Sequence, residues 1–509
     1  ACQWLASSVE DLTPRMGGTA ANLRRWMNLI PREHINRHPV IRISHVFSLA
    51  ILQEHELVEK ELHDLESLTK QWQRDPSIAQ SVIDDLLSAV TLQRLLIRGL
   101  NDDGHDMLAA VEAWLQKWPN ARDRFRGDAL NVAAFSCKTN GHIDQGISYA
   151  QQAYEVHKRD GGYLCLSWSQ LLAALLHLKR GDYPAAQQAS EAGLQLVIGR
   201  MNNHPEHASF HRAVLSAIYY EFDDIPRASE ELDYELAAID ATGTADFLIL
   251  TYLTRARLQF RLGQNSAGLE ALRLGRKLGQ RRHIPRLCVT LAGEECIWLS
   301  RLGEHASALD LARQFDFDRS IYGTYNVVAD KAARVGPRLL LSHSPEMAVA
   351  QLKEALARST EKGFHHRRTE LLILQSIALL RSNREEEAFA AWSTALNIAT
   401  KYGYRRVFLD DAEIISTITY AARGKCDFIQ PSWLQTVQAS EEKNAEDALT
   451  KKEIRILKHL ESSRVNREIA ESLFISEGTL KWHLHNIYRK LGSKNRLGAL
   501  TAARQLGYL

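Results

Sequence analysis

The sequence GDYPAAQQAS at residues 181–190 contains the signals of a turn that leads into a new helix. Gly181 adopts a positive φ without strain and therefore suits the end of one helix. Pro184 fits the first turn of the next helix. Ala186 is small enough to let a neighbouring helix approach closely, and Ser190 lies one turn further along the same face. This stretch predicts the junction of a helical hairpin.

The same pattern recurs along the chain with a period of about 40 residues. The small position recurs at spacings of 40 or 42 residues, at Gly146, Ala186, Ala228, Gly268, Ala308, Ala348 and Ala388. Turn glycines lie five residues earlier at Gly141, Gly181, Gly263 and Gly303. Fifteen residues later we expect helix-ending glycines with positive φ at Gly161, Gly243, Gly323, Gly363 and Gly403. A single hairpin cannot bury its apolar face, so we predict an all-α solenoid of stacked hairpins, clear from about residue 125 to 420.

The ends and turns of this solenoid give weaker signals. Pro226 and Pro345 suit first helical turns, and Ser344 is a candidate N-cap. Residues 109–113 resemble a degraded copy of the repeat, so we expect the array to begin near residue 40. Basic residues gather at inter-unit turns at 281–283, 365–368 and 405–406, which we interpret as solvated turns in preference to anion sites.

Composition excludes several classes of protein. The net charge of the chain is +2, the content of charged residues is 24%, and the six cysteines form no CxxC pair. The absence of a CxxC pair favours thiols in helix cores of a reducing compartment over metal sites or disulfides. The longest apolar stretch, Tyr163–Leu178, is interrupted by polar residues and predicts a core helix, so we expect a cytoplasmic protein without a membrane partner. We find no HExxH, GxSxG or GxxxxGK[ST] sequence, so we expect no enzymatic activity and no metal or cofactor in this chain.

The last residues form a separate module with a basic balance. From Ala445 to Leu509 the chain has 12 Lys and Arg against 7 Asp and Glu, a net of +5. Thr450 and Glu453 form a candidate capping box for a first helix with an apolar stripe. A second helix follows at about 466–473, a third begins after Ser476, and a fourth covers about 496–506.

The third helix has one apolar face and one basic face. The apolar positions are Leu480, Leu484, Ile487 and Leu491. A helix of this kind fits the major groove of double-stranded DNA, with its N-terminal half at the base edges. We therefore expect Lys481, Trp482 and His485 to read bases, and other residues to hold phosphates. The full set of candidate DNA-binding residues is Arg467, Ser476, Thr479, Lys481, Trp482, His483, His485, Asn486, Arg489 and Lys490.

These residues resemble the C-terminal helix-turn-helix of the LuxR family of bacterial regulators. The resemblance covers about 60 residues, and its parts are Leu449-Thr450-x-x-Glu453, Asn466-Arg467-Glu468-Ile469-Ala470, Ile475-Ser476-x-x-Thr479-Leu480-Lys481-x-His483, Ile487-x-x-Lys490-Leu491 and Asn495-Arg496. Two positions depart from the family pattern, since Leu480 replaces the usual valine and Val465 replaces a small polar residue. The resemblance implies a four-helix domain in which the fourth helix mediates self-association.

The solenoid also resembles the large MalT-like regulators, with Leu23–Pro31 and His38-Pro39 similar to the start of their repeat domain. The resemblance implies a segment leading into the repeats at 1–40, a tetratricopeptide-like (TPR-like) sensor at 41–425, a linker at 426–447 and the LuxR-type helix-turn-helix at 448–509. Members of that class multimerise with ATP. Because this chain has no phosphate loop, either an ATPase domain lies upstream of Ala1 or the protein works without one.

The solenoid and the C-terminal module together predict a transcription regulator, and more specifically an activator. Its partners would be double-stranded DNA, RNA polymerase, a small-molecule or protein effector on the solenoid, and further copies of the chain as a dimer or higher homo-oligomer. The alternative is a TPR-like scaffold whose basic module contacts proteins. Steeply salt-dependent binding to duplex DNA would separate the two hypotheses.

Overall fold

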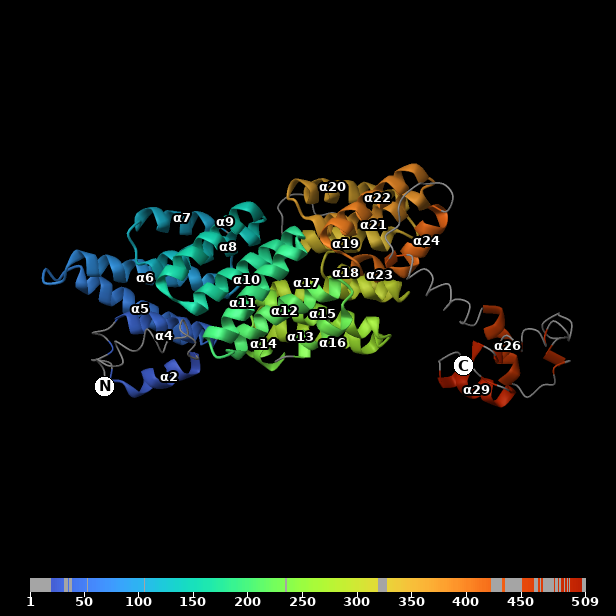
Figure 1. The fold of residues 1–509 in the computed structure, drawn as a ribbon, viewed down its shortest axis with the longest axis horizontal. Coiled ribbons are helices and arrows are strands. Elements are labelled where there is room, and N and C mark those ends of the chain that lie inside the picture. The colour runs from blue at the N-terminus through green and yellow to red at the C-terminus, as the bar shows by residue number, and fades with distance from the viewer. Residues whose placement is uncertain are drawn as a thin grey trace. The chain divides into compact units, whose positions relative to one another are not determined.

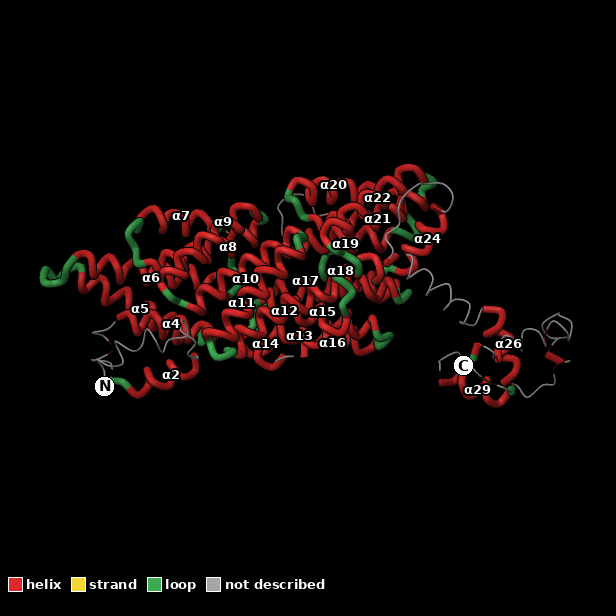
Figure 2. Tube along the Cα trace, viewed as in Figure 1, coloured by secondary structure: helices red, strands yellow, loops and turns green. Residues whose placement is uncertain are grey.

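The chain is all-helical throughout the part that the structure describes. A computed structural model describes residues 20–31, 35, 39–52, 54–104, 106–233, 236–318, 327–422, 433–434, 451–461, 466, 468–469, 480, 484, 487–488, 490–491, 493 and 495–505. Figure 2 draws these residues as helices and connecting turns, with no strand among them. The chain divides into two compact units, Ala1–Cys426 and Asp427–Leu509.

The first unit contains the predicted array of helical hairpins (Figure 1). Seven successive pairs occupy the described residues between 123 and 402. Their helices are α8 (Asp123–Asn140) with α9 (Ile143–Asp160), α10 (Tyr163–Arg180) with α11 (Tyr183–Arg200), α12 (Pro205–Glu221) with α13 (Ile225–Asp233) and α14 (Leu236–Thr242), α15 (Ala245–Arg261) with α16 (Asn265–Arg281), α17 (Pro285–Arg301) with α18 (His305–Gln314), α19 (Val327–Leu340) with α20 (Pro345–Glu361), and α21 (His365–Arg381) with α22 (Glu385–Tyr402).

The small residues of the repeat lie where helices pack most closely, as predicted. All seven are buried near the start of the second helix of a pair. A Cβ atom on Gly146 would lie 2.7 Å from Leu176 Cδ2, and one on Gly268 would lie 2.7 Å from Phe260 Cε1. Both distances are shorter than unbonded carbon atoms adopt, so a larger residue at either position would force the facing side chain to move.

The turn glycines have the predicted backbone conformation, with one exception. Gly141, Gly181, Gly263 and Gly303 have φ between 74° and 89°, and Gly161, Gly363 and Gly403 have φ between 66° and 81°. The expectation was wrong for Gly243, which follows α14 without entering the left-handed region. Gly323 lies outside the described residues. Ser344 takes the N-cap position of α20, but its side chain makes no capping hydrogen bond.

Further helices precede the regular repeats. They are α2 (Ala20–Leu29), α4 (Pro39–Ile51), α5 (His55–Trp72), α6 (Gln80–Leu100) and α7 (Met107–Lys117). Helix α7 buries Met107, Val111 and Trp114, and the Trp114 Nε1 donates to the Ser88 carbonyl at 3.0 Å. Helices therefore precede the regular repeats, but the alanines at 109 and 110 face solvent, so α7 lacks the buried small residue of the repeat. The start of the array near residue 40 stays a prediction.

Segments about 185 residues apart in the chain meet inside the array. Arg286 at the start of α17 binds Asp102 with Nη2 and Oδ1 at 2.7 Å, although 184 residues separate them. Val407 N donates to Glu221 Oε1 at 2.8 Å across 186 residues. Val407 belongs to the short helix α23 (Arg406–Leu409), which leads to α24 (Ala412–Ala422). The stacked hairpins therefore turn back on themselves, so that early and late repeats touch.

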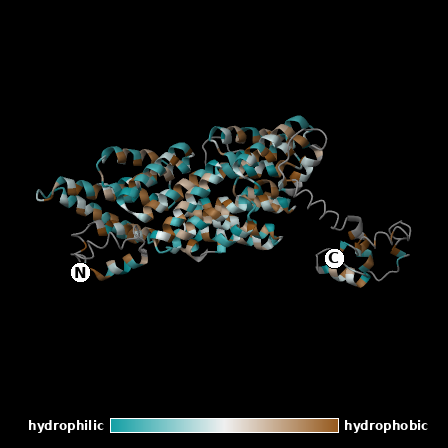
Figure 3. Cartoon of the chain, viewed as in Figure 1, coloured by the Kyte–Doolittle hydropathy of each residue, from teal (hydrophilic) through white to brown (hydrophobic). Residues whose placement is uncertain are grey.

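The apolar stretch at Tyr163–Leu178 is a buried helix, as predicted. It lies within α10, whose Leu171, Ala174 and Leu176 are fully covered by neighbouring helices. Figure 3 shows apolar and polar residues interspersed along the helices. Among the described residues, no helix combines the length and apolar character needed to cross a membrane.

Candidate functional site

The C-terminal unit has a small apolar core of its own. Helices α26 (Lys451–Glu461) and α29 (Arg496–Gln505) contribute to it. Its buried members are Ile456, Leu457, Leu460, Ile469, Leu480, Leu484, Ile487 and Ala503. The positions 480, 484 and 487 were predicted as the apolar stripe of the third helix, and all three are buried. Leu491, the fourth predicted position, is half-buried.

Two neighbouring residues fix the last helix of this unit to the first. The Asn495 side chain accepts a hydrogen bond from Gly498 N at 2.8 Å and so caps the start of α29. The Arg496 guanidinium donates from Nε to the Leu460 carbonyl at 3.2 Å, which satisfies a free carbonyl at the end of α26. Asn495 and Arg496 therefore have structural roles that the sequence motif alone did not predict.

Most of the predicted DNA-binding residues lie outside the described residues. Lys490 is described, and its side chain is half-buried. The others are Arg467, Ser476, Thr479, Lys481, Trp482, His483, His485, Asn486 and Arg489. Their contacts with DNA stay predictions.

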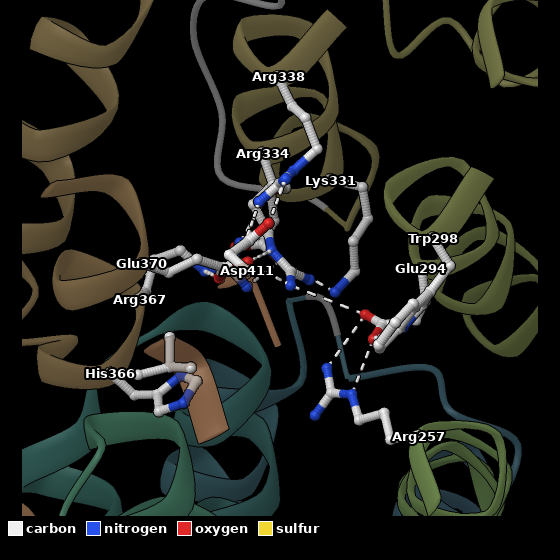
Figure 4. Close-up of polar contacts among 12 residues, drawn as sticks. Arg257, Glu294, Trp298, Lys331, Arg334, Arg338, His366, Arg367, Glu370 and Asp411 are labelled. Carbon is white, nitrogen blue, oxygen red and sulfur yellow. Dashed lines mark hydrogen bonds and ion pairs between the residues drawn. The ribbon is translucent and has the colours of Figure 1, made fainter. Parts of the chain in front are cut away.

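The first unit, Ala1–Cys426, is called the repeat unit below. Inside it, charged side chains from several helices form a buried network (Figure 4). Glu294 of α17 accepts hydrogen bonds from Arg257 Nε at 2.7 Å and Nη2 at 3.0 Å. Arg334 of α19 lies 3.7 Å from the same carboxylate and 2.5 Å from Glu370 of α21. Burial raises the pKa of Glu294, but the adjacent guanidinium groups outweigh burial and hold that pKa below its usual value.

A second part of the network holds α24 in place. Asp411 accepts hydrogen bonds from Arg301 at 2.8 Å and from Arg338 at 2.6 Å and 2.7 Å. Burial of Lys331 nearby lowers the pKa of its ammonium group to about 7. Removing one partner of such a buried pair leaves an uncompensated charge, so these contacts fix the arrangement of the later repeats.

The structure corrects our interpretation of two basic turns. Arg406 is only 5% exposed and lies between Asp410 and Asp223. Arg367 binds Asp330 at 3.0 Å. Neither guanidinium group is freely solvated, because Arg406 is buried, the Arg367 side chain is 19% exposed, and acidic side chains pair with both.

Two adjacent cavities lie between the early helices and the first repeats. One has a volume of about 140 Å³ and the other about 350 Å³. Phe47, Leu100, Trp168 and Thr244 line both, so the two cavities are neighbours separated by these four residues. Sequence periodicity did not indicate them, since their walls come from segments far apart in the chain.

A polar cluster borders the smaller cavity. Ligand-type atoms of Asp128, His157 and Cys165 lie within 4.8 Å of one another, and His157 Nε2 is 3.5 Å from Asp128 Oδ1. Asn131 Nδ2 lies 3.3 Å from the same His157 nitrogen. The spacing of these residues in the sequence predicted no such group, because hairpin stacking brings them together.

The four cysteines that the structure describes lie in helices as free thiols. Cys137, Cys165 and Cys296 are buried, and Cys288 is partly buried. Burial raises the pKa of Cys137 and of Cys296 to about 12, so neither is a thiolate near neutral pH. Cys2 and Cys426 lie outside the described residues.

Comparison with known proteins finds a family match for each of the two units. A family model of the MalT-like TPR region matches residues 102–419, and one of the bacterial regulatory proteins of the luxR family matches residues 447–503. The chain belongs to the LuxR-type regulators with a MalT-like TPR region.

Individual relatives agree with this family. The HTH-type transcriptional regulator AlkS of Ectopseudomonas oleovorans is 21% identical over the whole chain, which spans 58% of the length of that protein. The probable csgAB operon transcriptional regulatory protein of Salmonella typhimurium is 39% identical over 98 residues, covering 18% of this chain and 45% of that protein. A crystal structure of a Rap protein complexed with competence and sporulation factor has a TM-score of 0.55 at 12% identity, covering 72% of this chain and 99% of that one. The Rap likeness concerns the fold alone.

Proposed function

We propose that this chain senses an effector and binds DNA as a transcription activator. In this proposal the repeat unit binds an effector, and the C-terminal helix-turn-helix binds promoter DNA and acts with RNA polymerase. The observation that carries the proposal is the joining of a luxR-type module at 447–503 to a MalT-like repeat region at 102–419 in one chain.

Two structural features support the finer parts of the proposal. The cavities around Trp168 provide space for an effector within the repeat unit. Leu497 on α29 is 76% exposed and is therefore accessible to a second copy of the chain, as self-association through this helix requires. A dimer would let two modules bind adjacent half-sites.

Selection of random duplex DNA by the full chain tests the DNA-binding proposal. We expect enrichment of a short motif, with affinity that falls steeply as salt rises. Lys481→Ala should relax base preference and weaken binding to the selected motif by about 1–3 kcal/mol. Lys490→Ala should instead weaken selected and scrambled duplexes alike, because phosphate contacts carry no sequence information.

Other outcomes would change the proposal in defined ways. If no motif is enriched and duplex binding is equally weak for every sequence, the protein-interaction scaffold becomes the better account. If the two lysine variants behave identically on selected and scrambled sites, the division between base-reading and phosphate-binding residues is wrong.

A further inference from the structure

The smaller cavity is enclosed mainly by apolar and aromatic side chains. Its walls come from α4, α6, α8 and α10, and its aromatic members are Phe47, Phe125, Phe135 and Trp168. Thr244 and Asp246 close one side at the start of α15. A molecule held here would contact helices that precede the regular repeats and helices that belong to them.

The acidic group at the start of α15 is already neutralised. Asp246 binds Arg286 Nη1 at 2.9 Å and also pairs with Lys138. Burial opposes ionisation of this carboxyl, but the two cations outweigh burial and keep its pKa below the usual value. Since this carboxylate has its counter-ions, it offers no unpaired charge to a ligand. Arg124 and Asp128 also line the cavity, and each has an interaction of its own within the protein. The rest of the lining is mainly apolar and favours an uncharged molecule.

The amide oxygen of Gln93 in the cavity wall has no hydrogen-bond partner among the residues that the structure describes. Gln93 of α6 is 6% exposed, and its Oε1 makes no hydrogen bond. A buried amide oxygen without a donor costs about 1–3 kcal/mol. A ligand hydroxyl can both donate and accept, so it satisfies the Gln93 amide in either of its two orientations.

The size of the cavity limits the ligand. A volume of about 140 Å³ is close to that of an engineered protein cavity of roughly 150 Å³ that binds benzene. One six-membered ring with a small substituent therefore fills it. The aromatic lining provides edge and face contacts for such a ring.

We propose that this cavity is the effector site of the protein and that it takes an uncharged single-ring molecule with a hydroxyl group, of the phenol class. The ring packs against Trp168 and Phe47, and the hydroxyl hydrogen-bonds to Gln93. This inference rests on the proposed function, because it names the effector class for the repeat unit. Occupancy alters DNA binding only if the ligand binds one conformation of the array more tightly than another.

Calorimetric titration of the full chain with phenol and with toluene tests the binding. We expect both to bind, with phenol the tighter ligand. Gln93→Leu removes the amide and should weaken phenol binding by about tenfold while leaving toluene binding unchanged or stronger. Gln170→Leu is the matched control, since Gln170 lies on α10 outside the cavity lining, and it should bind both ligands as the unaltered chain does.

A second readout separates a folding defect from a lost contact. Gln93→Leu should raise the melting temperature of the ligand-free chain, because it removes an unsatisfied buried oxygen. If neither phenol nor toluene binds, or if Gln93→Leu leaves the preference for phenol unchanged, the assignment of this cavity is overturned.

The affinity of the full chain for the selected duplex, measured with and without phenol, tests the effector role. A change in affinity for the selected duplex, lost in Gln93→Leu, supports the effector site. Phenol binding without any change in affinity overturns it. A chain that binds phenol but no duplex at all would instead contradict the proposed function, so the two failures are distinct.

Discussion

Tyr220 and Asp410 are 190 residues apart, yet the Tyr220 hydroxyl donates to the Asp410 carboxylate, with Oη 2.9 Å from Oδ1 and 3.0 Å from Oδ2. Tyr220 lies in the last turn of α12, the first helix of the third pair, and Asp410 directly follows α23. The Arg405 N also donates to the Glu221 carbonyl at 2.9 Å. These contacts hold the last helices of the array against its third repeat.

We expect Tyr220→Phe to lower the free energy of unfolding by about 1.5 kcal/mol, because it leaves a buried carboxylate with one donor fewer. Urea titration followed by circular dichroism measures the change. Tyr219→Phe is the control, since Tyr219 bonds the exposed Glu191 at 3.2 Å and solvent can replace that contact. Equal losses in the two variants would mean that the long-range contact adds no more to stability than the solvent-exposed one.

The small residue of each repeat should not tolerate a larger side chain. Ala348 is fully buried in α20, so Ala348→Leu should cost about 2 kcal/mol by forcing α20 away from its neighbours. Ala350 is exposed on the same helix, and Ala350→Leu should change the unfolding free energy by less than about 0.5 kcal/mol. Urea titration of both variants compares them directly, and a tolerated leucine at 348 would show that close packing at this position is dispensable.

Buried histidines should make the repeat unit sensitive to acid. His211 is fully buried between Ser167, whose Oγ lies 2.9 Å from His211 Nε2, and Ser190. Burial lowers the pKa of His211 to about 3, and the pKa of His207 beside Ser167 is lowered as well.

Because the folded pKa of His211 lies below the unfolded value of about 6.5, its contribution to stability is complete above pH 6.5 and is lost as pH falls toward 3. We expect a loss of about 2 kcal/mol between pH 6.5 and 5 from this group. Urea titration at several pH values measures it. His211→Gln should flatten this pH dependence, whereas replacement of the exposed His343 by Gln should leave it as steep as before.

The Arg496 contact should stabilise the C-terminal unit without contacting DNA. Arg496→Met removes the hydrogen bond to the Leu460 carbonyl and should destabilise that unit by about 1 kcal/mol. Arg504→Met removes only a surface pair with Glu461 at 2.9 Å and should cost less than about 0.5 kcal/mol. Hydrogen exchange of the amides in α26 reports on the C-terminal unit separately from the repeats. Unchanged protection in Arg496→Met would show that the contact with Leu460 does not stabilise this unit.

Self-association through α29 should depend on Leu497. Leu497→Asp places a charge on the exposed apolar position and should raise the dissociation constant of the oligomer by about tenfold. Leu262→Asp is the matched control, because Leu262 is 63% exposed but lies in the repeat unit. Sedimentation of both variants measures the constant, and an effect of Leu262→Asp alone would move the self-association surface to the repeats.

The helical hairpins and the apolar stripe at 480, 484 and 487 were predictable from the sequence. Both depend on residues within about 40 positions of one another, and the 3.6-residue helical period together with glycine conformation determines them. The buried positions at Gly146 through Ala388 and the positive φ of Gly141 and Gly181 follow from that local chemistry.

The contacts between early and late repeats were decided only by the tertiary structure. How far the array winds in each turn depends on small rotations between successive hairpins, which no local pattern encodes. That winding buries Arg406, joins Tyr220 to Asp410, and brings Gln93, Trp168 and Thr244 to one cavity. The family of the protein can therefore be inferred from its local signals, whereas the position of a candidate effector site depends on how the repeats close on one another.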